Sequence, residues 1–549
     1  MSKIIEFGPD ARQKLVDGID KIADAVVATL GPNGRNVVIS KPGQAPQSTK
    51  DGVTVAKNIS LEEPTEELGV QMLKQAAIKT ADNAGDGTTT STLLAREIVK
   101  AGLKRLDDGA NAVDIKRGID KGVEYVVESL RSITEQVQGQ EQLEQIATIS
   151  ANNDKTVGKL ISTAMEKVGK EGVVHIEESK TGETYLETVE GMQFNRGYKS
   201  PYFVTNNNTM STTLDDCYIL IADHTFNSVK ELLPILESVS NTSKSLLLIA
   251  KDIDNEALAT LIVNKMRGSL KVCAVKAPDF GDRQKLVLED IAVLTGGTVF
   301  SKEKGMKLDK FSWEWFGESR VATITKETTT IVDGKGSEDA ITARVEELAN
   351  QIDKSQTPFE TERLQDRMSK FVGGVAIVHV GGNTETEMNE KKDRVDDALH
   401  ATKAAIEEGV LPGGGVALLG ASTSVPLKDD KINKLSDFDF GINIVKEACR
   451  KPFTQILLNA GYELDIIEGL SKEVDELDWA GYDLKNTTVT NLKEAGIIDP
   501  FKVTRSALQN ASSIAGTILL TEATIVEKPS ENNQPQMDPA AMMGMGMGM

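Results

Sequence analysis

The chain has 549 residues, with 62 Lys and Arg against 83 Asp and Glu, which gives a formal net charge of −21. This length exceeds what one compact core supports and predicts three or four domains. Binding to a phosphate backbone needs a basic surface, so the acidic balance argues against nucleic acid as a partner. No apolar run reaches the roughly 18–20 residues of a membrane helix. The first residues also lack the order of a secretory signal.

The cysteines and histidines are scattered along the chain and show no spacing typical of a disulfide framework or a zinc site. They are Cys217, Cys273, Cys449, His175, His224, His379 and His400. We therefore expect a protein of the reducing cytoplasm, with no membrane partner. Its chemistry should not depend on His or Cys.

Helical periodicity dominates roughly the first 130 residues. One apolar stripe runs over residues 15–30 and ends at a Gly-Pro pair, which is a helix-stop signal. A further helical stretch over 142–171 is followed by a strand-like alternation at 172–177.

The middle of the chain has a different pattern of apolar residues. Short apolar runs at 218–222 and 246–250 alternate with helical segments, which predicts βα units around a partly parallel sheet. Helical periodicity returns at 393–473 and at 500–513. The simplest arrangement is a helical domain that is interrupted by an inserted α/β domain. Residues 531–549 are polar and then alternate Gly with Met, a composition typical of a disordered tail.

Four Gly-rich turns lie next to predicted helices, at residues 29–35, 50–54, 85–90 and 412–415. In the third, Asp86-Gly87 is followed by three threonines that open a helix. The free N–H groups of a helix start, together with hydroxyls, make an anion site. Asp86 is placed to hold Mg²⁺ against a phosphate. Each turn alone is also typical of an ordinary loop, and the chain has no P-loop motif.

Two helices of the middle region, at 229–239 and 258–266, are apolar over a wider arc than the roughly 100° stripe that a surface helix needs. The additional apolar surface either packs against a second layer of the fold or stays exposed as an apolar binding groove. The residues alone favour packing.

Taken in their order, these motifs resemble the group I chaperonins, the GroEL family. The resemblance covers nearly the whole chain, including a Gly- and Met-rich end. The matching stretches are 28–38, 50–56, 84–90, 196–203, 275–278, 397–401 and 503–507.

The resemblance implies a multidomain α and α/β fold with three domains, two of them discontinuous. These would be a mainly helical equatorial domain (1–132 and 408–526), a small α+β intermediate domain (133–189 and 376–407), an inserted α/β apical domain that binds clients (190–375), and a disordered Gly/Met tail (527–549). Gly191 and Gly374 would lie at the hinge between the apical and intermediate domains.

The resemblance also implies an ATPase that uses ATP and Mg²⁺, with K⁺ as a further candidate ion. Asp86 would be the Mg²⁺ ligand. Asp51 and Asp397 would position and polarise the attacking water, with Asp397 arriving as the domains close; which of the two is the base stays open. The nucleotide would be bound by Thr29, Leu30, Gly31, Pro32, Lys50, Asp86, Gly87, Thr88, Thr89, Thr90, Ser150, Gly413, Gly414, Asp483 and Asp499.

The implied partners are unfolded or partly folded proteins, a co-chaperonin lid, and copies of the chain in a seven-membered ring. Clients would be captured on apolar apical grooves and refolded in the ring cavity. The implied client-binding residues are Tyr198, Tyr202, Phe203, Leu233, Leu236, Leu258, Ile262 and Val263.

The chain also departs from the family pattern. The stretch 483–485 reads Asp-Leu-Lys where the family commonly has Asn-Ala-Ala near the adenine. Asp107, Asp108 and Thr454 replace small or basic residues in the stretch aligned with ring–ring contacts. Like charges across a symmetric contact are unfavourable, so we expect a single ring or a weaker double ring.

Two other functions compete with an ATP-driven folding machine. One is a holdase or scaffold that binds clients without needing turnover, and the other is a small-molecule kinase. The three acidic residues at a predicted phosphate site favour the folding machine over the scaffold, and nothing in the sequence suggests the second substrate pocket that a kinase needs.

Overall fold

The computed structural model describes residues 2–40, 46–151, 153–168, 173–179, 182–189, 191–207, 209–242, 244–355, 358–372, 374–382, 384–427, 435–474 and 479–528. The chain divides into two compact units. The first joins Met1–Lys159 to Thr384–Met549, and the second is Leu160–Asn383. Among the described residues, no helix combines the length and the apolar character needed to cross a membrane.

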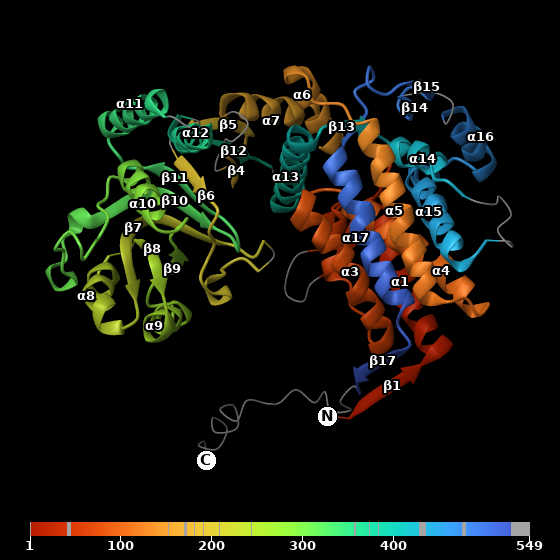
Figure 1. Ribbon diagram of the computed structural model, residues 1–549, viewed down its shortest axis with the longest axis horizontal. Helices are drawn as coiled ribbons and strands as arrows, with labels where there is room; N and C mark the ends of the chain where they lie inside the picture. The colour runs from red at the N-terminus through yellow and green to blue at the C-terminus, as the bar shows by residue number, and fades with distance from the viewer. Residues whose placement is uncertain are drawn as a thin grey trace, which may run out of the picture. The chain divides into compact units, whose positions relative to one another are not determined.

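The first unit is mainly helical. Its core packs α1, α3, α4, α5, α15 and α17, and Figure 1 shows α17 alongside α3, α4 and α5 although the sequence separates them widely. Ile115, Ile119, Val126 and Leu130 form a helical stripe on α5 and are buried in this core. The helices are α1 (Gly8–Val27), α2 (Gly52–Asn58), α3 (Pro64–Ala84), α4 (Thr88–Asp107), α5 (Ala112–Ser132), α6 (Gly139–Ser150), α13 (Glu385–Glu408), α14 (Val416–Thr423), α15 (Asp437–Asn459), α16 (Leu464–Val474) and α17 (Phe501–Leu519).

Short strand pairs tie the loops of this unit together. All four pairs are antiparallel, and β1 with β17 joins the two ends of the described chain, as Figure 1 shows. The pairs are β1 (Lys3–Phe7) with β17 (Ala523–Glu527), β2 (Val37–Ile39) with β3 (Gln47–Thr49), β13 (Val410–Pro412) with β16 (Ile498–Pro500), and β14 (Ala480–Asp483) with β15 (Thr488–Asn491).

The second unit is built on a six-stranded sheet of order β6-β11-β10-β7-β8-β9. The strands β7, β8 and β9 are parallel and the other pairs are antiparallel. The elements are β6 (Gly191–Phe194), η1 (Pro201–Phe203), β7 (Thr212–Phe226), α8 (Val229–Ser240), β8 (Ser245–Ile253), α9 (Asn255–Met266), β9 (Val272–Lys276), α10 (Asp282–Thr295), η2 (Leu308–Lys310), η3 (Trp313–Trp315), β10 (Phe316–Ile324), β11 (Thr329–Gly334), α11 (Glu338–Lys354) and α12 (Pro358–Val372).

A smaller sheet of order β4-β12-β5 completes this unit. Its strands are β4 (Val173–Glu178), β5 (Tyr185–Val189) and β12 (Val375–Val380), and β12 is buried along its whole length. α7 (Lys155–Val168) leads into β4 and crosses the division between the two units.

The predicted fold class is confirmed: a helical unit formed from both ends of the chain encloses an α/β unit in sequence. The predicted apolar runs at 218–222 and 246–250 lie in β7 and β8, and the sheet is parallel there. The single helical stretch expected at 142–171 is instead two helices, α6 and α7, separated by a short turn.

The three-domain division stays a prediction. Residues assigned to the intermediate domain are shared between the two units, whose boundaries in the sequence fall after Lys159 and after Asn383. The tail at 531–549 lies outside the described residues, so its expected disorder also stays a prediction.

Candidate functional site

A cavity of about 960 Å³ lies in the first unit and is bordered by all four Gly-rich turns. Apart from Gly413, every residue predicted to contact the nucleotide or to act in catalysis lines it. These lining residues are Thr29, Leu30, Gly31, Pro32, Lys50, Asp51, Asp86, Gly87, Thr88, Thr89, Thr90, Ser150, Asp397, Gly414, Asp483 and Asp499. Gly413 lies just behind the wall, because a Cβ placed on it would be 3.1 Å from Asp499 Oδ1.

The first turn follows the end of α1. Gly31 adopts a φ of 82°, in the left-handed region that favours glycine. Its carbonyl oxygen accepts a hydrogen bond from Gly34 N–H at 3.0 Å. The side-chain amide of Asn459 donates to Leu30 O at 2.9 Å. These contacts hold the backbone of this turn open toward the cavity.

The second turn places Asp51 at the start of α2. Its carboxylate accepts hydrogen bonds from Val53 N–H at 3.1 Å and Thr54 N–H at 2.9 Å, which caps the helix. Gly52 is packed against the start of α4, since a Cβ on it would be 2.3 Å from Thr89 Oγ1. Two helix starts therefore meet at one side of the cavity.

The third turn joins α3 to α4. Gly87 adopts a φ of 83°, and a Cβ on it would be 2.7 Å from Val503 Cγ1, so both conformation and space require glycine. Gly87 N–H donates to Asp86 Oδ1 at 2.5 Å. The N–H groups of Thr88, Thr89 and Thr90 begin α4 and have no partner within the helix. The positive end of α4 thus borders the cavity next to a carboxylate.

The fourth turn lies between β13 and α14. Leu411 of β13 pairs with Asp499 of β16, which brings that carboxyl to the cavity wall. Gly414 has a φ of 66°, and a Cβ on it would meet nothing within 4 Å. Backbone with this much open space lets a ligand approach closely.

Asp483 lies at the end of β14, where the chain departs from the family pattern. Its buried carboxylate accepts hydrogen bonds from Lys485 N–H at 2.8 Å and from Asn486 Nδ2 at 2.6 Å. The carboxylate therefore stabilises its own turn. The neighbouring lining residues Leu484 and Ile497 add an apolar part to the cavity wall.

Carboxyl groups crowd the cavity and raise one another's pKa. Burial raises the pKa of Asp397 well above its usual range, and the Asp86 and Asp51 carboxylates raise it further. Burial also raises the pKa of Asp86, against the effect of Gly87 N–H. Burial, followed by the Asp86 charge, raises the pKa of Asp499 to about 7. Such a cavity favours a ligand that brings positive charge with it.

Four further carboxyl side chains line the cavity that the sequence analysis did not select: Asp393, Glu390, Glu141 and Glu144. Asp393 lies on α13 one turn before Asp397 and lines the same cavity. Burial, followed by the Asp51 charge, raises the pKa of Asp393 to about 7. The i, i+4 spacing from Asp397 was the available signal.

The residues fit Mg²⁺ as a partner of a phosphate ligand. Within the described part of the chain, no group of three or more His, Cys, Asp or Glu side chains is arranged to hold a metal by itself. Mg²⁺ at nucleotide sites takes one or two carboxylates and completes its shell with phosphate oxygens and water. Asp86, beside the start of α4, offers such a carboxylate.

The predicted client-binding residues lie in the second unit and differ in exposure. Tyr202, Leu233 and Val263 are exposed by 64%, 42% and 43%. Leu258 and Ile262 are half-buried against the core. η1 packs beside α9, and α9 beside α8, so the exposed side chains belong to neighbouring elements.

The expectation that clients contact three of these side chains is wrong. The structure buries Tyr198, Phe203 and Leu236 in the hydrophobic core of this unit. Part of the wide apolar arc of α8 therefore packs inward against the sheet. Met266 on α9 is also exposed, although the sequence analysis did not select it as a client-binding residue.

A helical unit closed by both ends of the chain around an α/β insertion, with Gly-rich turns converging on one cavity, is the architecture of a chaperonin subunit. The sequence profile of the TCP-1/cpn60 chaperonin family matches residues 22–529. The chain belongs to this family, which confirms the resemblance.

A solved structure shares the fold. It is the crystal structure of the chaperonin gp146 from the bacteriophage EL 2 (Pseudomonas aeruginosa), determined in the presence of ATP-BeFx. The TM-score is 0.66 at 22% sequence identity, and the match covers 96% of this chain and 100% of that chain. At this identity the likeness establishes the fold.

Proposed function

We propose that this protein is an ATP-dependent chaperonin that captures non-native proteins and promotes their refolding, driven by Mg-ATP binding and hydrolysis. The observation that carries the proposal is the convergence of Asp51, Asp86 and Asp397 on one cavity at the N-terminus of α4. The family membership supports a chaperonin role, and the phage relative solved with ATP-BeFx supports nucleotide binding.

The triphosphate binds at the start of α4, where Thr88–Thr90 offer backbone N–H groups and hydroxyls. The adenine ring of the nucleotide lies toward Leu484 and Ile497, the apolar part of the cavity wall. Asp499 accepts a hydrogen bond from the ribose. When bound at Asp86, Mg²⁺ neutralises charge that develops on the phosphates.

We assign the base of the reaction to Asp397 and the orienting role to Asp51. Asp51 already accepts two backbone hydrogen bonds as the cap of α2, so its position is fixed. Asp397 has no hydrogen-bond or ion-pair partner within the described residues and keeps its lone pairs for a water proton. Burial and the neighbouring carboxylates raise the pKa of Asp397, which makes its carboxylate a stronger base than that of an ordinary aspartate.

Clients bind on the exposed side chains of η1, α8 and α9, chiefly Tyr202, Leu233, Val263 and Met266. Burying one large apolar side chain contributes about 1.5–3 kcal/mol, so each subunit alone binds weakly. A ring repeats the surface and converts weak contacts into firm capture through multivalency.

Copies of the chain form the ring through exposed strand pairs. Ile5, Phe7 and Ile525 on β1 and β17, and Val38 on β2, are all more than half exposed. Unpaired strand edges with apolar side chains favour pairing with another chain. Seven subunits, a single or weak double ring, a co-chaperonin lid, a K⁺ ion and a cytoplasmic location stay predictions.

Asp397→Ala tests the proposal when ATP hydrolysis and refolding of a denatured client are measured on the same preparation. We expect near-complete loss of turnover with ATP still bound, and loss of refolding with it. Asp396→Ala is the matched control, since that neighbouring carboxylate on α13 is exposed and, among the described residues, pairs with His400 at 3.5 Å. Unchanged refolding by Asp397→Ala would favour the alternative, a holdase or scaffold ring with little dependence on turnover.

A further inference from the structure

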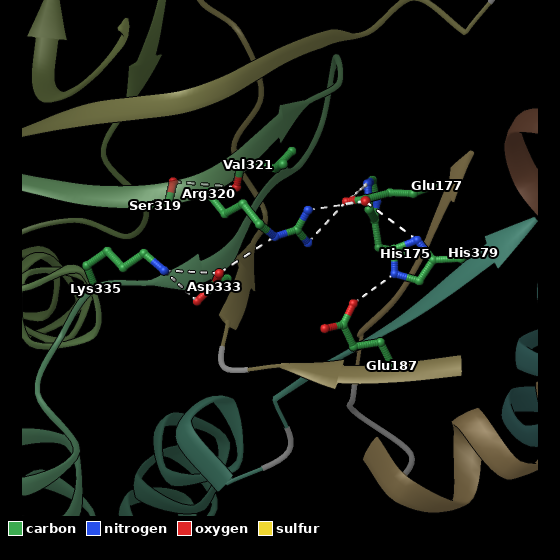
Figure 2. A network of polar contacts seen from close by, with 9 residues as sticks. All are labelled: His175, Glu177, Glu187, Ser319, Arg320, Val321, Asp333, Lys335 and His379. Carbon is green, nitrogen blue, oxygen red and sulfur yellow. Dashed lines mark hydrogen bonds and ion pairs between the residues drawn. The ribbon is translucent and has the colours of Figure 1, made fainter. Parts of the chain in front are cut away.

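Glu177 on β4 joins the small sheet to the six-stranded sheet of the same unit. Its carboxylate accepts two hydrogen bonds from the guanidinium of Arg320 on β10, at 3.2 Å from Nη1 and 3.4 Å from Nη2 (Figure 2). Beside this ion pair, Val321 and Val332 pack against Val375 and Ile377. A bidentate ion pair and a small apolar seam therefore connect the two sheets.

Two imidazoles lie against the same carboxylate. His175 Nε2 is 3.7 Å from Glu177 Oε1, and His379 Nδ1 is 4.0 Å from Glu177 Oε2. On its other side, His379 Nε2 lies 2.8 Å from Glu187 Oε2, and the Tyr185 ring stacks on the imidazole at 4.4 Å. Figure 2 shows both histidines turned toward the Glu177 carboxylate that Arg320 also contacts.

The charge of this cluster depends on the two imidazoles. On β11 and just after it, Asp333 lies 3.6 Å from Arg320 Nε and Lys335 lies 3.1 Å from Asp333. With both imidazoles neutral, the cluster has two cations, Arg320 and Lys335. They face three carboxylates, those of Glu177, Glu187 and Asp333. With both protonated, four cations face the same three carboxylates. Histidine is the side chain that ordinarily changes charge between about pH 5 and 8.

The predicted hinge passes beside this cluster. Gly191 follows β5, and Gly374, with a φ of 59°, precedes β12. A rotation of the six-stranded sheet about these glycines would separate Arg320 from Glu177. This step rests on the proposed function, because it assumes that the predicted hinge moves.

We propose that His175 and His379 make the Glu177–Arg320 contact a proton-operated latch between the two sheets. Neutral imidazoles leave Glu177 to Arg320. Protonated imidazoles attract Glu177 away from Arg320 and at the same time repel the guanidinium. Acidification in the range where histidine titrates therefore loosens the six-stranded sheet from the small sheet, with no nucleotide required.

Hydrogen exchange of the full-length, nucleotide-free protein, measured by mass spectrometry at pH 7.5 and pH 5.5 and corrected for the intrinsic rates, tests the latch. We expect the protection of residues 316–324 to fall about two- to fivefold at the lower pH, the range that a partly exposed ion pair supports. The double variant His175→Gln/His379→Gln should keep its protection at both pH values. Arg320→Gln should show the reduced protection at both.

His224→Gln is the matched control, because this histidine of the same unit pairs with Glu231 at 3.2 Å, away from Glu177. It should reproduce the wild-type pH dependence. If the double variant fails to fold, His379→Gln alone should show a smaller pH effect than wild type. An equal fall in protection in wild type and in the histidine variants, or no fall in wild type, would overturn the latch. Because no ATP is present, either result is independent of whether the proposed ATPase activity is correct.

Discussion

Gly52 and Thr89 lie so close together that a Cβ placed on Gly52 would be 2.3 Å from Thr89 Oγ1. Gly52 is the first residue of α2 and Thr89 lies in the first turn of α4. Their contact therefore sets the distance between Asp51, which caps α2, and the helix start that we propose binds the phosphates.

Gly52→Ala should weaken ATP hydrolysis by about tenfold or more, because a shift of about 1 Å in catalytic geometry costs up to a hundredfold. The measurement is kcat and the dissociation constant for ATP. Gly420→Ala on α14 is the control, since a Cβ there meets nothing within 4 Å and alanine favours a helix. Wild-type turnover in Gly52→Ala would contradict this role of the contact.

Asp290 should be essential for the stability of the second unit. This buried carboxylate on α10 accepts hydrogen bonds from Arg367 at 2.7 and 2.9 Å and from Arg344 at 2.9 Å, which ties α12 and α11 to α10. Asp290→Ala leaves two guanidinium groups without their buried partner and should cost about 3 kcal/mol or more of unfolding free energy. Denaturant unfolding measures the loss, with the exposed Asp215→Ala as control. Equal denaturant concentrations at the unfolding midpoints of the two variants would refute the prediction.

The first unit of the nucleotide-free protein should become more stable as the pH falls from about 8 to about 6. The pKa of Asp499 is raised to about 7, above the ordinary value of 3.8, so the folded state binds protons that the unfolded chain releases. The stability that this group contributes is complete below its unfolded pKa and is lost as the pH rises through about 7. Asp393, with its pKa also raised to about 7, adds to the same trend.

Asp499→Asn should therefore raise the melting temperature at pH 8 by a few degrees and flatten its pH dependence. Differential scanning calorimetry without nucleotide checks this. A variant that melts lower than wild type at pH 8 would show that the Asp499 charge is compensated by a partner. Asp215→Asn, at an exposed position on β7, serves as the control for a change of net charge.

Client capture should depend on the exposed side chains of α8 and α9. Leu233→Ser with Val263→Ser should lower the binding of a denatured client at least tenfold while ATP hydrolysis stays at the wild-type level, since repeated weak apolar contacts are lost in every subunit. Leu286→Ser on α10 is the control, because Leu286 is 41% exposed in the same unit. Unchanged client binding by the double variant would move the capture surface elsewhere.

Much of the architecture could be predicted from the sequence, because the signals were local. The stripe over residues 15–30 and the apolar runs at 218–222 and 246–250 follow the helix and strand periods directly. The Gly-rich turns were visible as turns, yet only the chaperonin resemblance indicated that they share one site. The structure supplies the reason: α17 and the β13–β16 pair bring the C-terminal part of the chain against α3 and α4.

Other features depend on packing that the sequence does not encode locally. Asp393 sits in a charged run at 390–394 that is typical of a solvated helix face, and only the position of α13 brings it to the cavity. Phe203 and Tyr198 belong to a stretch matching the client-binding surface, but they turn inward and fill the core under the sheet. Exposure is a property of the folded unit and could not be deduced from residue type.

The proposed function requires the cavity of the first unit to be the site of Mg-ATP. The most direct test is a cryo-EM map of the wild-type protein with Mg²⁺ and a non-hydrolysable ATP analogue. We expect triphosphate density at Thr88–Thr90, a metal at Asp86, and Asp397 facing the terminal phosphate. Nucleotide density outside this cavity, or an analogue bound there with Asp86 and Asp397 both directed away from the phosphates, would contradict the proposed function.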